Sequence, residues 1–199
     1  NLGLKGIQLH IHIADECFAA RIPIPGTHNV YNALAAAAVG RQLGLSNDEI
    51  RAGIETARTI DGRTNLIETG TMTVIDDCYN ANPLSMKASI DVLATALGRT
   101  VAVLGDMGDL GENERQLHYE VGSHLASKGI DILFCAGRLV TELARAVQEH
   151  NPKCEIHLFE KRDEMLKELL PFLRQGDSVL VKASHFMEFS EVVEEIITI

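Results

Sequence analysis

The sequence predicts an α/β fold with a mostly parallel sheet, and three observations support this. Strand-like and helix-like segments alternate from residue 65 to the end of the chain. Several of the strand-like segments end in polar residues that precede a loop and a helix start. One of them, from Val74 to Pro83, reads V-I-D-D-C-Y-N-A-N-P. Open α/β sheets bind their ligands in such loops, at the carboxyl ends of the strands.

The composition is that of a globular protein, with 46% hydrophobic and 23% charged residues in 199. No apolar run is long enough to cross a bilayer, and no secretory signal pattern is present, so we expect no membrane insertion. The net charge of −10 argues against a nucleic-acid surface but is compatible with one bound nucleotide. The chain opens in strand-like sequence without Met, so we expect a fragment of a larger protein.

The four cysteines show no C-x-x-C spacing and are Cys17, Cys78, Cys135 and Cys154. Without a secretion signal, this pattern favours reduced thiols in a cytoplasm. Cys78 lies inside the D-D-C-Y-N segment and is interpreted as a small filler, with a nucleophile as the alternative. No basic residue is adjacent to it in sequence.

The first 24 residues contain an alternating stretch, 8–13, that predicts a strand with one solvated face. His10 and His12 share that face, and a metal site is the alternative to solvent exposure. An alanine-rich helix is predicted over 29–43, with Gly44 as its stop. Ser46 then begins a second helix that runs to about residue 57, and Glu49 completes a capping box.

Residues 60–63 are interpreted as a linker, which divides the chain into domains 1–61 and 62–199. Strands are expected at 65–68, 73–76, 100–104, 132–135, 155–158 and 178–182, and helices at 83–96, 112–127, 139–149, 162–174 and 187–197. The first two strands form a hairpin through Gly70 and Thr71. The remaining alternation implies parallel strands with helices on both faces.

A first polar cluster, 26–32, lies at the start of the alanine-rich helix and reads G-T-H-N-V-Y-N. Asn29 and Asn32 are three residues apart, so they share a helix face. Amides both donate and accept hydrogen bonds, which suits the edge of a purine. The alternative is that Thr27 or Asn29 only caps the helix.

The second cluster contains Asp76 and Asp77, whose side chains alternate at the end of a strand. A carboxylate there can accept hydrogen bonds from ribose hydroxyls or help to hold Mg²⁺, or it can cap the following helix. Tyr79, Asn80 and Asn82 follow, and their side chains either hydrogen-bond phosphate or substrate, or shape the turn.

Three further residues are candidates for contact with anions. Arg63 has the planar fork of donors that suits phosphoryl oxygens, although a lone linker arginine is usually solvated. Lys182 and Ser184 follow a strand, and Ser184 is alternatively a helix cap. In the loop 105–112 the glycine spacing is not G-x-G-x-x-G, and two acids would repel a pyrophosphate, which excludes a nicotinamide site. His118, in the next helix, is either on the surface or directed at this loop.

The sequence contains no G-x-x-x-x-G-K-[ST] motif. If the protein uses ATP, another part of the polypeptide must therefore hold its phosphates.

Together these motifs resemble the Mur ligases. The matching segments are P-G-T-H-N-V-Y-N-A-L-A-A-A, D-G-R, D-D-C-Y-N-A-N-P-L-S-M, L-G-D-M-G-D-L-G and V-K-A-S-H-F-M-E. The combination of D-D-x-Y-N-A-N-P with G-D-M-x-x-L-G is typical of the members that add D-Ala-D-Ala to UDP-N-acetylmuramoyl-tripeptide. The resemblance implies the tail of a central ATP-binding domain in 1–61 and a Rossmann-like ligase domain in 62–199. The missing N-terminal and central domains would supply most of the ATP phosphate and Mg²⁺ sites.

The resemblance also implies roles for individual residues. On the nucleotide, His28, Asn29 and Asn32 would lie on the adenine side, Arg63 at the γ-phosphate and Asp77 at the ribose. On the substrate side, the implied residues are Tyr79, Asn80, Asn82, Lys182 and Ser184, with Arg63 and Lys182 as the catalytic pair. Ala183 and His185 depart from the Gly and Arg that are usual in the family.

The implied reaction is ATP-dependent amide formation in bacterial peptidoglycan synthesis. ATP converts the tripeptide carboxylate into an acyl phosphate, and the amine of D-Ala-D-Ala then displaces phosphate. Arg63 and Mg²⁺ would offset the repulsion between the two anions. We expect a hinge near 60–63 to control closure, and residues 1–199 alone to be inactive. The alternatives are a sister ligase, such as a folylpolyglutamate synthase, or a non-catalytic nucleotide-binding module.

Overall fold

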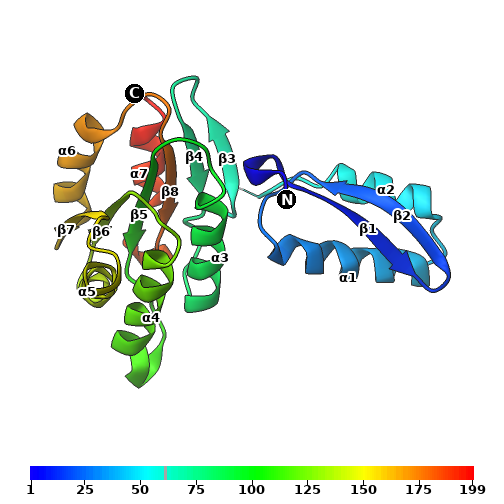
Figure 1. The fold of residues 1–199 in the computed structure, drawn as a ribbon, viewed down its shortest axis with the longest axis horizontal. Coiled ribbons are helices and arrows are strands. Elements are labelled where there is room, and N and C mark those ends of the chain that lie inside the picture. The colour runs from blue at the N-terminus through cyan, green and yellow to red at the C-terminus, as the bar shows by residue number, and fades with distance from the viewer. Residues whose placement is uncertain (61) are drawn as a thin grey trace. The chain divides into compact units, whose positions relative to one another are not determined.

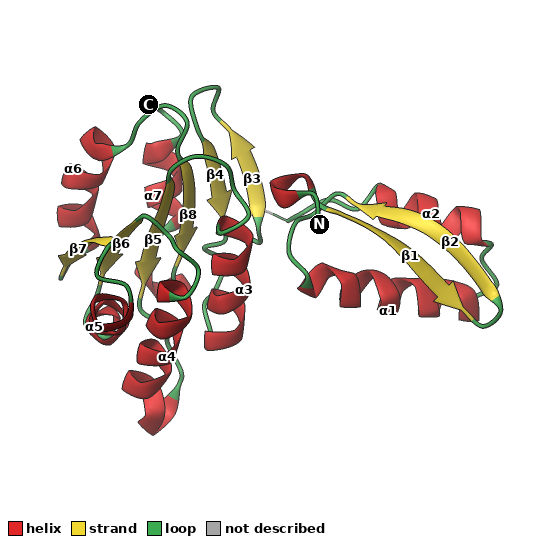
Figure 2. Cartoon of the chain, viewed as in Figure 1, coloured by secondary structure: helices red, strands yellow, loops and turns green. Residues whose placement is uncertain are grey.

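The computed structural model describes residues 1–60 and 62–199, and Figures 1 and 2 show the fold. The chain divides into two compact units, unit 1 (Asn1–Thr59) and unit 2 (Ile60–Ile199). Asp61, at the predicted domain boundary and within the predicted hinge, lies outside the described residues. Assignment of the first unit to a central ATP-binding domain stays a prediction.

Unit 1 is a β-hairpin with two helices. After a 3₁₀ turn (η1, Gly3–Lys5), strand β1 (Ile7–Ile13) pairs antiparallel with β2 (Glu16–Ile22). The predicted strand is confirmed as β1. Strand β2 was not predicted, although it too alternates buried and exposed residues. The buried side chains of both strands share a core with α1 (His28–Gln42) and α2 (Asn47–Glu55).

The predicted helix stop and the predicted capping box of unit 1 are both present in the structure. Gly44, just beyond α1, has a φ of +84°, which is the left-handed conformation expected of a helix stop. The capping box at α2 is confirmed. The Ser46 hydroxyl accepts from the Glu49 N–H at 3.3 Å, and the Glu49 carboxylate accepts from the Ser46 N–H at 2.8 Å.

Unit 2 contains a six-stranded sheet in the order β3-β4-β8-β5-β6-β7. Strand β3 is antiparallel to β4, and the strands from β4 to β7 in that order are parallel. The hairpin and the mostly parallel sheet are therefore confirmed. The bounds are β3 (Asn65–Glu68), β4 (Thr73–Asp76), β5 (Thr100–Gly105), β6 (Ile132–Ala136), β7 (Glu155–Phe159) and β8 (Ser178–Lys182).

Helices cover both faces of this sheet, as Figure 1 shows. On one face lie α3 (Pro83–Leu93), α4 (Glu114–Ala126) and α5 (Val140–His150), and on the other α6 (Arg162–Phe172) and α7 (Ser190–Ile196). Buried side chains of α6 and α7 share a core with Val74, Val103 and Val181 of three neighbouring strands. Because both faces are covered, every residue of β5, β6 and β8 is buried, which explains their continuous apolar sequences.

Two helices begin at least two residues later than predicted. The segment expected from residue 112 starts as a 3₁₀ turn (η2, Gly111–Asn113) before α4. The segment expected from residue 187 is preceded by another (η3, His185–Met187), and Glu188 adopts a left-handed φ of +54° before α7. Such a residue interrupts regular helix geometry, so α7 begins after it.

Candidate functional site

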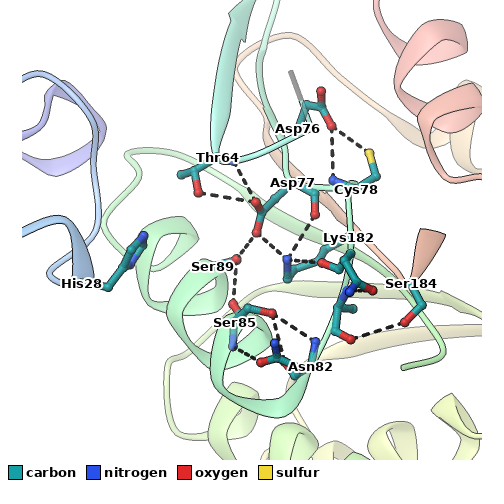
Figure 3. Close-up of polar contacts among 12 residues, drawn as sticks. His28, Thr64, Asp76, Asp77, Cys78, Asn82, Ser85, Ser89, Lys182 and Ser184 are labelled. Atoms are coloured by element: carbon teal, nitrogen blue, oxygen red, sulfur yellow. Dashed lines mark hydrogen bonds and ion pairs between the residues drawn. The ribbon is translucent and has the colours of Figure 1, made fainter. Parts of the chain in front are cut away.

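The candidate site lies where β4, β8 and β5 end side by side. Parallel strands place their carboxyl ends at one edge of the sheet, so the loops that follow these three strands meet there. They contribute the D-D-C-Y-N-A-N segment after β4, A-S-H after β8 and G-D-M-G-D around the end of β5. Figure 3 shows polar contacts of the loops after β4 and β8.

Lys182 and Asp77 form a buried ion pair at the centre of this edge. The Lys182 ammonium lies 2.6 Å from Oδ2 of Asp77 and also donates to the carbonyls of Asp77 and Asn80, at 3.1 and 2.8 Å. Both residues are buried. All three donors of the ammonium are thus used inside the protein, and these contacts favour a role for Lys182 in holding the loop after β4.

The Asp77 carboxylate also connects two other segments. Its Oδ1 accepts from the backbone N–H of Thr64 at 2.8 Å, and its Oδ2 accepts from the hydroxyl of Ser89 in α3. Figure 3 shows the carboxylate surrounded by these partners. Both of its oxygens therefore have partners in the protein, and its contact with a ribose stays a prediction.

Asp76 points to the opposite side of the strand end, as the alternation predicts (Figure 3). Its Oδ2 accepts from the N–H of Gly62 at 3.0 Å, and its Oδ1 accepts from the Cys78 thiol at 2.7 Å. Burial, and then the hydrogen bond to Asp76, raise the pKa of the Cys78 thiol well above its ordinary value. A protonated, buried thiol is a poor nucleophile, which supports the interpretation of Cys78 as a filler.

Arg63 is exposed, and its guanidinium packs on the ring of Tyr79. The central carbon of its guanidinium lies 4.2 Å from the centre of the Tyr79 ring, and the Tyr79 N–H donates to the Gly62 carbonyl at 2.9 Å. The Tyr79 ring itself is half exposed. The structure thus brings two of the predicted site residues into contact, although they are separated by the hairpin β3–β4.

Ser184 joins three loops. Its hydroxyl accepts from the Gly108 N–H at 2.8 Å and donates to the Ala81 carbonyl at 3.3 Å, and its own N–H donates to the Asp106 carbonyl at 3.1 Å. It makes no side-chain cap to η3, so the alternative interpretation as a helix cap is wrong. Ser184 is buried and ties the loops after β8, β5 and β4 together.

The two asparagines after Tyr79 are exposed. The side chain of Asn82 caps α3, because its Oδ1 accepts from the Ser85 N–H at 2.9 Å. Helix α3 is therefore capped by this residue and not by an aspartate. The Asn80 Oδ1 accepts from the N–H of Ala81 at 2.9 Å and shapes the turn. Substrate contacts of Asn80 and Asn82 stay predictions.

An open cleft of about 420 Å³ lies among these loops. Two exposed aromatic residues, Tyr79 and Phe186, line it, and the His185 ring lies 6.3 Å from the Tyr79 ring. The remaining lining residues are Asn80, Gly108, Asp109, Ser184 and His185. The cleft thus combines aromatic surface with a few polar groups, which is typical of small-ligand sites.

Asp106 has a structural role that sequence reasoning missed. Its carboxylate accepts from the N–H groups of Arg138, Leu139 and Val140 at 2.9, 2.9 and 2.8 Å, and so caps α5. Helix N-termini bind phosphate in several nucleotide-binding folds. Here an internal carboxylate occupies the start of α5. The partners are more than 30 residues away in sequence, so no local pattern indicated the contact.

His118 is buried and directed at the loop after β5, which decides between the two alternatives. Its Nε2 accepts from the Met107 N–H at 2.9 Å, and its Nδ1 lies 2.7 Å from the Glu114 carbonyl. The carbonyl can only accept, so the ring is neutral with its proton on Nδ1. The histidine holds the loop in place from inside.

The remaining predicted residues lie in unit 1. Asn32 donates to the Asn29 side chain at 3.0 Å, which confirms that both share a face of α1. Asn29 is buried, donates to the Pro25 carbonyl at 2.8 Å and lies 3.2 Å from a ring nitrogen of His28. Thr27 occupies the N-cap position without a side-chain capping bond. An adenine contact for these three residues stays a prediction.

Unit 1 also contains a cavity and a histidine–cysteine pair. The cavity has a volume of about 260 Å³, and Asn29 and Asn32 line it together with apolar side chains of β2, α1 and α2. On the hairpin, the Cys17 sulfur lies 3.6 Å from the His12 ring across the strands. No group of three or more His, Cys, Asp or Glu among the described residues is arranged to hold a metal ion.

Comparisons with known proteins identify the family. Residues 62–185 match the family model described as Mur ligase, glutamate ligase domain. The chain is 34% identical to the UDP-N-acetylmuramoyl-tripeptide–D-alanyl-D-alanine ligase of Bacillus subtilis, over 88% of this chain and 39% of that protein. It spans about two fifths of the length of this relative.

Solved structures agree with this result. A crystal structure of MurF from Acinetobacter baumannii is similar, with 31% identity and a TM-score of 0.90. The match covers all of this chain and 44% of the MurF chain. MurF from Thermotoga maritima in complex with ADP matches 98% of this chain and 44% of its own, with 26% identity and a TM-score of 0.79. No helix in the described residues is sufficiently long and apolar to span a membrane. The chain belongs to the Mur ligase family.

Proposed function

We propose that this chain is the C-terminal part of an ATP-dependent ligase that adds D-Ala-D-Ala to UDP-N-acetylmuramoyl-tripeptide. The names of its relatives support this substrate pair. The observation that carries the proposal is the contact of Arg63 with Tyr79, a lining residue of the cleft. Arg63 is exposed, so an anion can reach its guanidinium.

In the first step, an oxygen of the tripeptide carboxylate attacks the γ-phosphorus of ATP, and ADP leaves. Two anions approach each other, and the five N–H donors of Arg63 stabilise the charge on the transferring phosphoryl group. In the second step, the amine of D-Ala-D-Ala attacks the acyl carbon. The tetrahedral intermediate expels phosphate, and the nitrogen loses a proton as the amide forms.

The cleft in unit 2 receives the amine substrate in this proposal. D-Ala-D-Ala is a small zwitterion, and the cleft offers a carboxylate at Asp109, an imidazole at His185 and amide groups at Asn80. Asn82 and Ser184 shape its walls through the α3 cap and the loop contacts. We assign Lys182 and Asp77 the task of holding the loop that carries Tyr79.

For the nucleotide, His28, Asn29 and Asn32 remain our candidates on the adenine side. A relative with bound ADP supports nucleotide binding in the family. The described residues offer no cluster that would hold Mg²⁺, so we place its ligands in other parts of the parent protein. Both substrates are soluble in water, and we place the reaction in the bacterial cytoplasm.

The test is phosphate release by the full-length parent protein with ATP, Mg²⁺, UDP-N-acetylmuramoyl-tripeptide and a panel of amines. We expect release that depends on D-Ala-D-Ala. Release that depends on another amine, such as glutamate with a folate acceptor, would assign the chain to a sister ligase. No release with any amine would leave a non-catalytic nucleotide-binding module and overturn the proposal.

Two variants sharpen this test. Arg63→Ala should lower kcat by about 100-fold or more, the magnitude seen when one transition-state donor is removed. Arg115→Ala is the matched control, because its side chain is 70% exposed and forms a surface ion pair with Glu142. We expect Arg115→Ala to retain full activity. Equal rates for the two variants would contradict the role of Arg63.

A further inference from the structure

We infer that Tyr79 is a positioning residue for Arg63. We further infer that Asp76 and Asp77 fix the backbone on either side of Arg63. The inference rests on the proposed function, in which Arg63 meets the γ-phosphoryl group. It assigns Asp76, Asp77 and Tyr79 a shared task, which is to make Arg63 a fixed part of unit 2.

The residue before Arg63 is held through both of its backbone polar groups. The Gly62 N–H donates to Oδ2 of Asp76 at 3.0 Å, and the Gly62 carbonyl accepts from the Tyr79 N–H at 2.9 Å. The chain segments around Gly62 and Tyr79 are also in close contact. A Cβ at Gly62 would lie 3.1 Å from the Tyr79 nitrogen, and its φ is +72°, a conformation that favours glycine.

The residue after Arg63 is held by the second aspartate. The Thr64 N–H donates to Oδ1 of Asp77 at 2.8 Å, and Thr64 is buried with a left-handed φ of +51°. Asp77 is itself held by Lys182, at 2.6 Å. The adjacent carboxylates Asp76 and Asp77, which point to opposite sides of the strand end, therefore each hold one neighbour of Arg63.

The side chain of Arg63 is then directed by the Tyr79 ring. A guanidinium carbon 4.2 Å from a ring centre is within the range of a cation–π contact. The contact uses the face of the guanidinium, whereas its N–H donors lie in the guanidinium plane and stay available to phosphoryl oxygens. The ring needs only its face for this task, so its hydroxyl group is dispensable.

Fixing an arginine in this way lowers the reorganisation needed at the moment of phosphoryl transfer. A displacement of about 1 Å in a group that acts on the transition state can cost about 100-fold in rate. Loss of the ring should therefore lower kcat much more than it raises the KM for ATP. Loss of the hydroxyl alone should change neither.

The experiment uses four variants of the full-length parent enzyme, assayed by phosphate release with D-Ala-D-Ala. They are Tyr79→Phe, Tyr79→Leu, Arg63→Ala and the double variant Tyr79→Leu/Arg63→Ala. We expect Tyr79→Phe to stay within about 3-fold of the parent and Tyr79→Leu to lose about 10- to 100-fold in kcat. The double variant should be no slower than Arg63→Ala, because the ring acts through the arginine.

Two outcomes would overturn the inference. If Tyr79→Phe is as slow as Tyr79→Leu, the hydroxyl contacts substrate directly. If the losses in the double variant multiply, Tyr79 acts independently of Arg63. Thermal unfolding of each variant controls for misfolding. A variant with the same melting temperature as the parent protein has lost only the local contact.

An NMR measurement separates failure of this inference from failure of the proposed function. In the parent protein with labelled arginine, the ring current of Tyr79 should shift the side-chain protons of Arg63, and Tyr79→Leu should remove the shift. This readout needs no catalysis. A missing shift in an active ligase overturns the positioning role alone, whereas a shift in a protein without ligase activity overturns the proposed function alone.

Discussion

The ammonium of Lys182 lies 2.6 Å from the Asp77 carboxylate, and this buried ion pair joins the ends of β8 and β4 across 105 positions of sequence. Each charge is the principal partner of the other. Removing one of the two residues therefore lowers the stability of the protein more than replacing both by uncharged residues. Removing one partner leaves an unpaired charge in the protein interior.

Replacing Lys182 by methionine should therefore destabilise unit 2 by about 3–5 kcal/mol. The double variant Lys182→Met/Asp77→Asn should recover part of this loss, because the unpaired carboxylate is gone. Denaturant unfolding followed by circular dichroism measures both. Lys128→Met is the control, since Lys128 pairs with Asp91 at the surface, where a pair contributes about 1 kcal/mol or less. Equal effects of the two lysine variants would contradict the assignment.

The cap of α5 by Asp106 gives a second prediction. Asp106→Asn keeps one oxygen but turns an N–H₂ group toward the Arg138 N–H, so one hydrogen bond is lost together with the negative charge at the helix start. We expect a loss of about 1–3 kcal/mol in the free energy of unfolding. Asp109→Asn, in the same loop but exposed, should be nearly neutral because asparagine tolerates its φ of +58°.

Cysteine reactivity tests the packing around the site. Cys17 is exposed, whereas the other three cysteines are buried. Burial raises the pKa of the Cys154 thiol to about 12, and it also raises the pKa of the Cys78 and Cys135 thiols. Iodoacetamide at neutral pH should therefore modify Cys17 alone, and all four after denaturation, as mass spectrometry would show. Modification of native Cys78 would mean that the loop after β4 opens.

Asp91 should contribute to the acid sensitivity of the chain. Burial raises the pKa of its carboxyl, but hydrogen bonds and charge from Lys128 and His124 outweigh this and lower the pKa overall from 3.8. A lowered pKa in the folded state means that the stabilisation is present above about pH 4 and is lost as the pH falls below it.

Replacing Asp91 by asparagine should therefore reduce stability near pH 7 and leave it almost unchanged near pH 2. The side chain is 42% exposed, so the difference should be about 1 kcal/mol or less. Urea unfolding at both pH values would measure it. A larger loss at pH 2 than at pH 7 would reverse the sign and contradict the assignment.

Most of the fold could be predicted because neighbouring residues in the sequence determine where its strands and helices form. Continuous apolar segments marked β5, β6 and β8, which helices cover on both faces. The capping box at Ser46 marked the start of α2. In contrast, Glu188, the left-handed residue before α7, makes a long-range contact, in which Arg162 of α6 donates to its carbonyl at 3.0 Å. Sequence periodicity contains no information about such a contact.

The sequence predicted the position of the site but not the hydrogen-bond and ion-pair partners of its residues. The strand end at Asp76 and Asp77 was recognised because an apolar segment stops at two acids. The partners of these acids could not be read from spacing, since Lys182 follows Asp77 by 105 residues and Gly62 precedes Asp76 by 14. For the same reason the spacing gave no sign of the contact between Arg63, which is exposed, and Tyr79.

The carboxylate of Asp106 places an anion of the protein itself at the start of α5. Three backbone donors are already saturated before any nucleotide arrives. The start of α5 is therefore closed to a phosphate, because the Asp106 carboxylate already accepts from these donors and would repel a second anion.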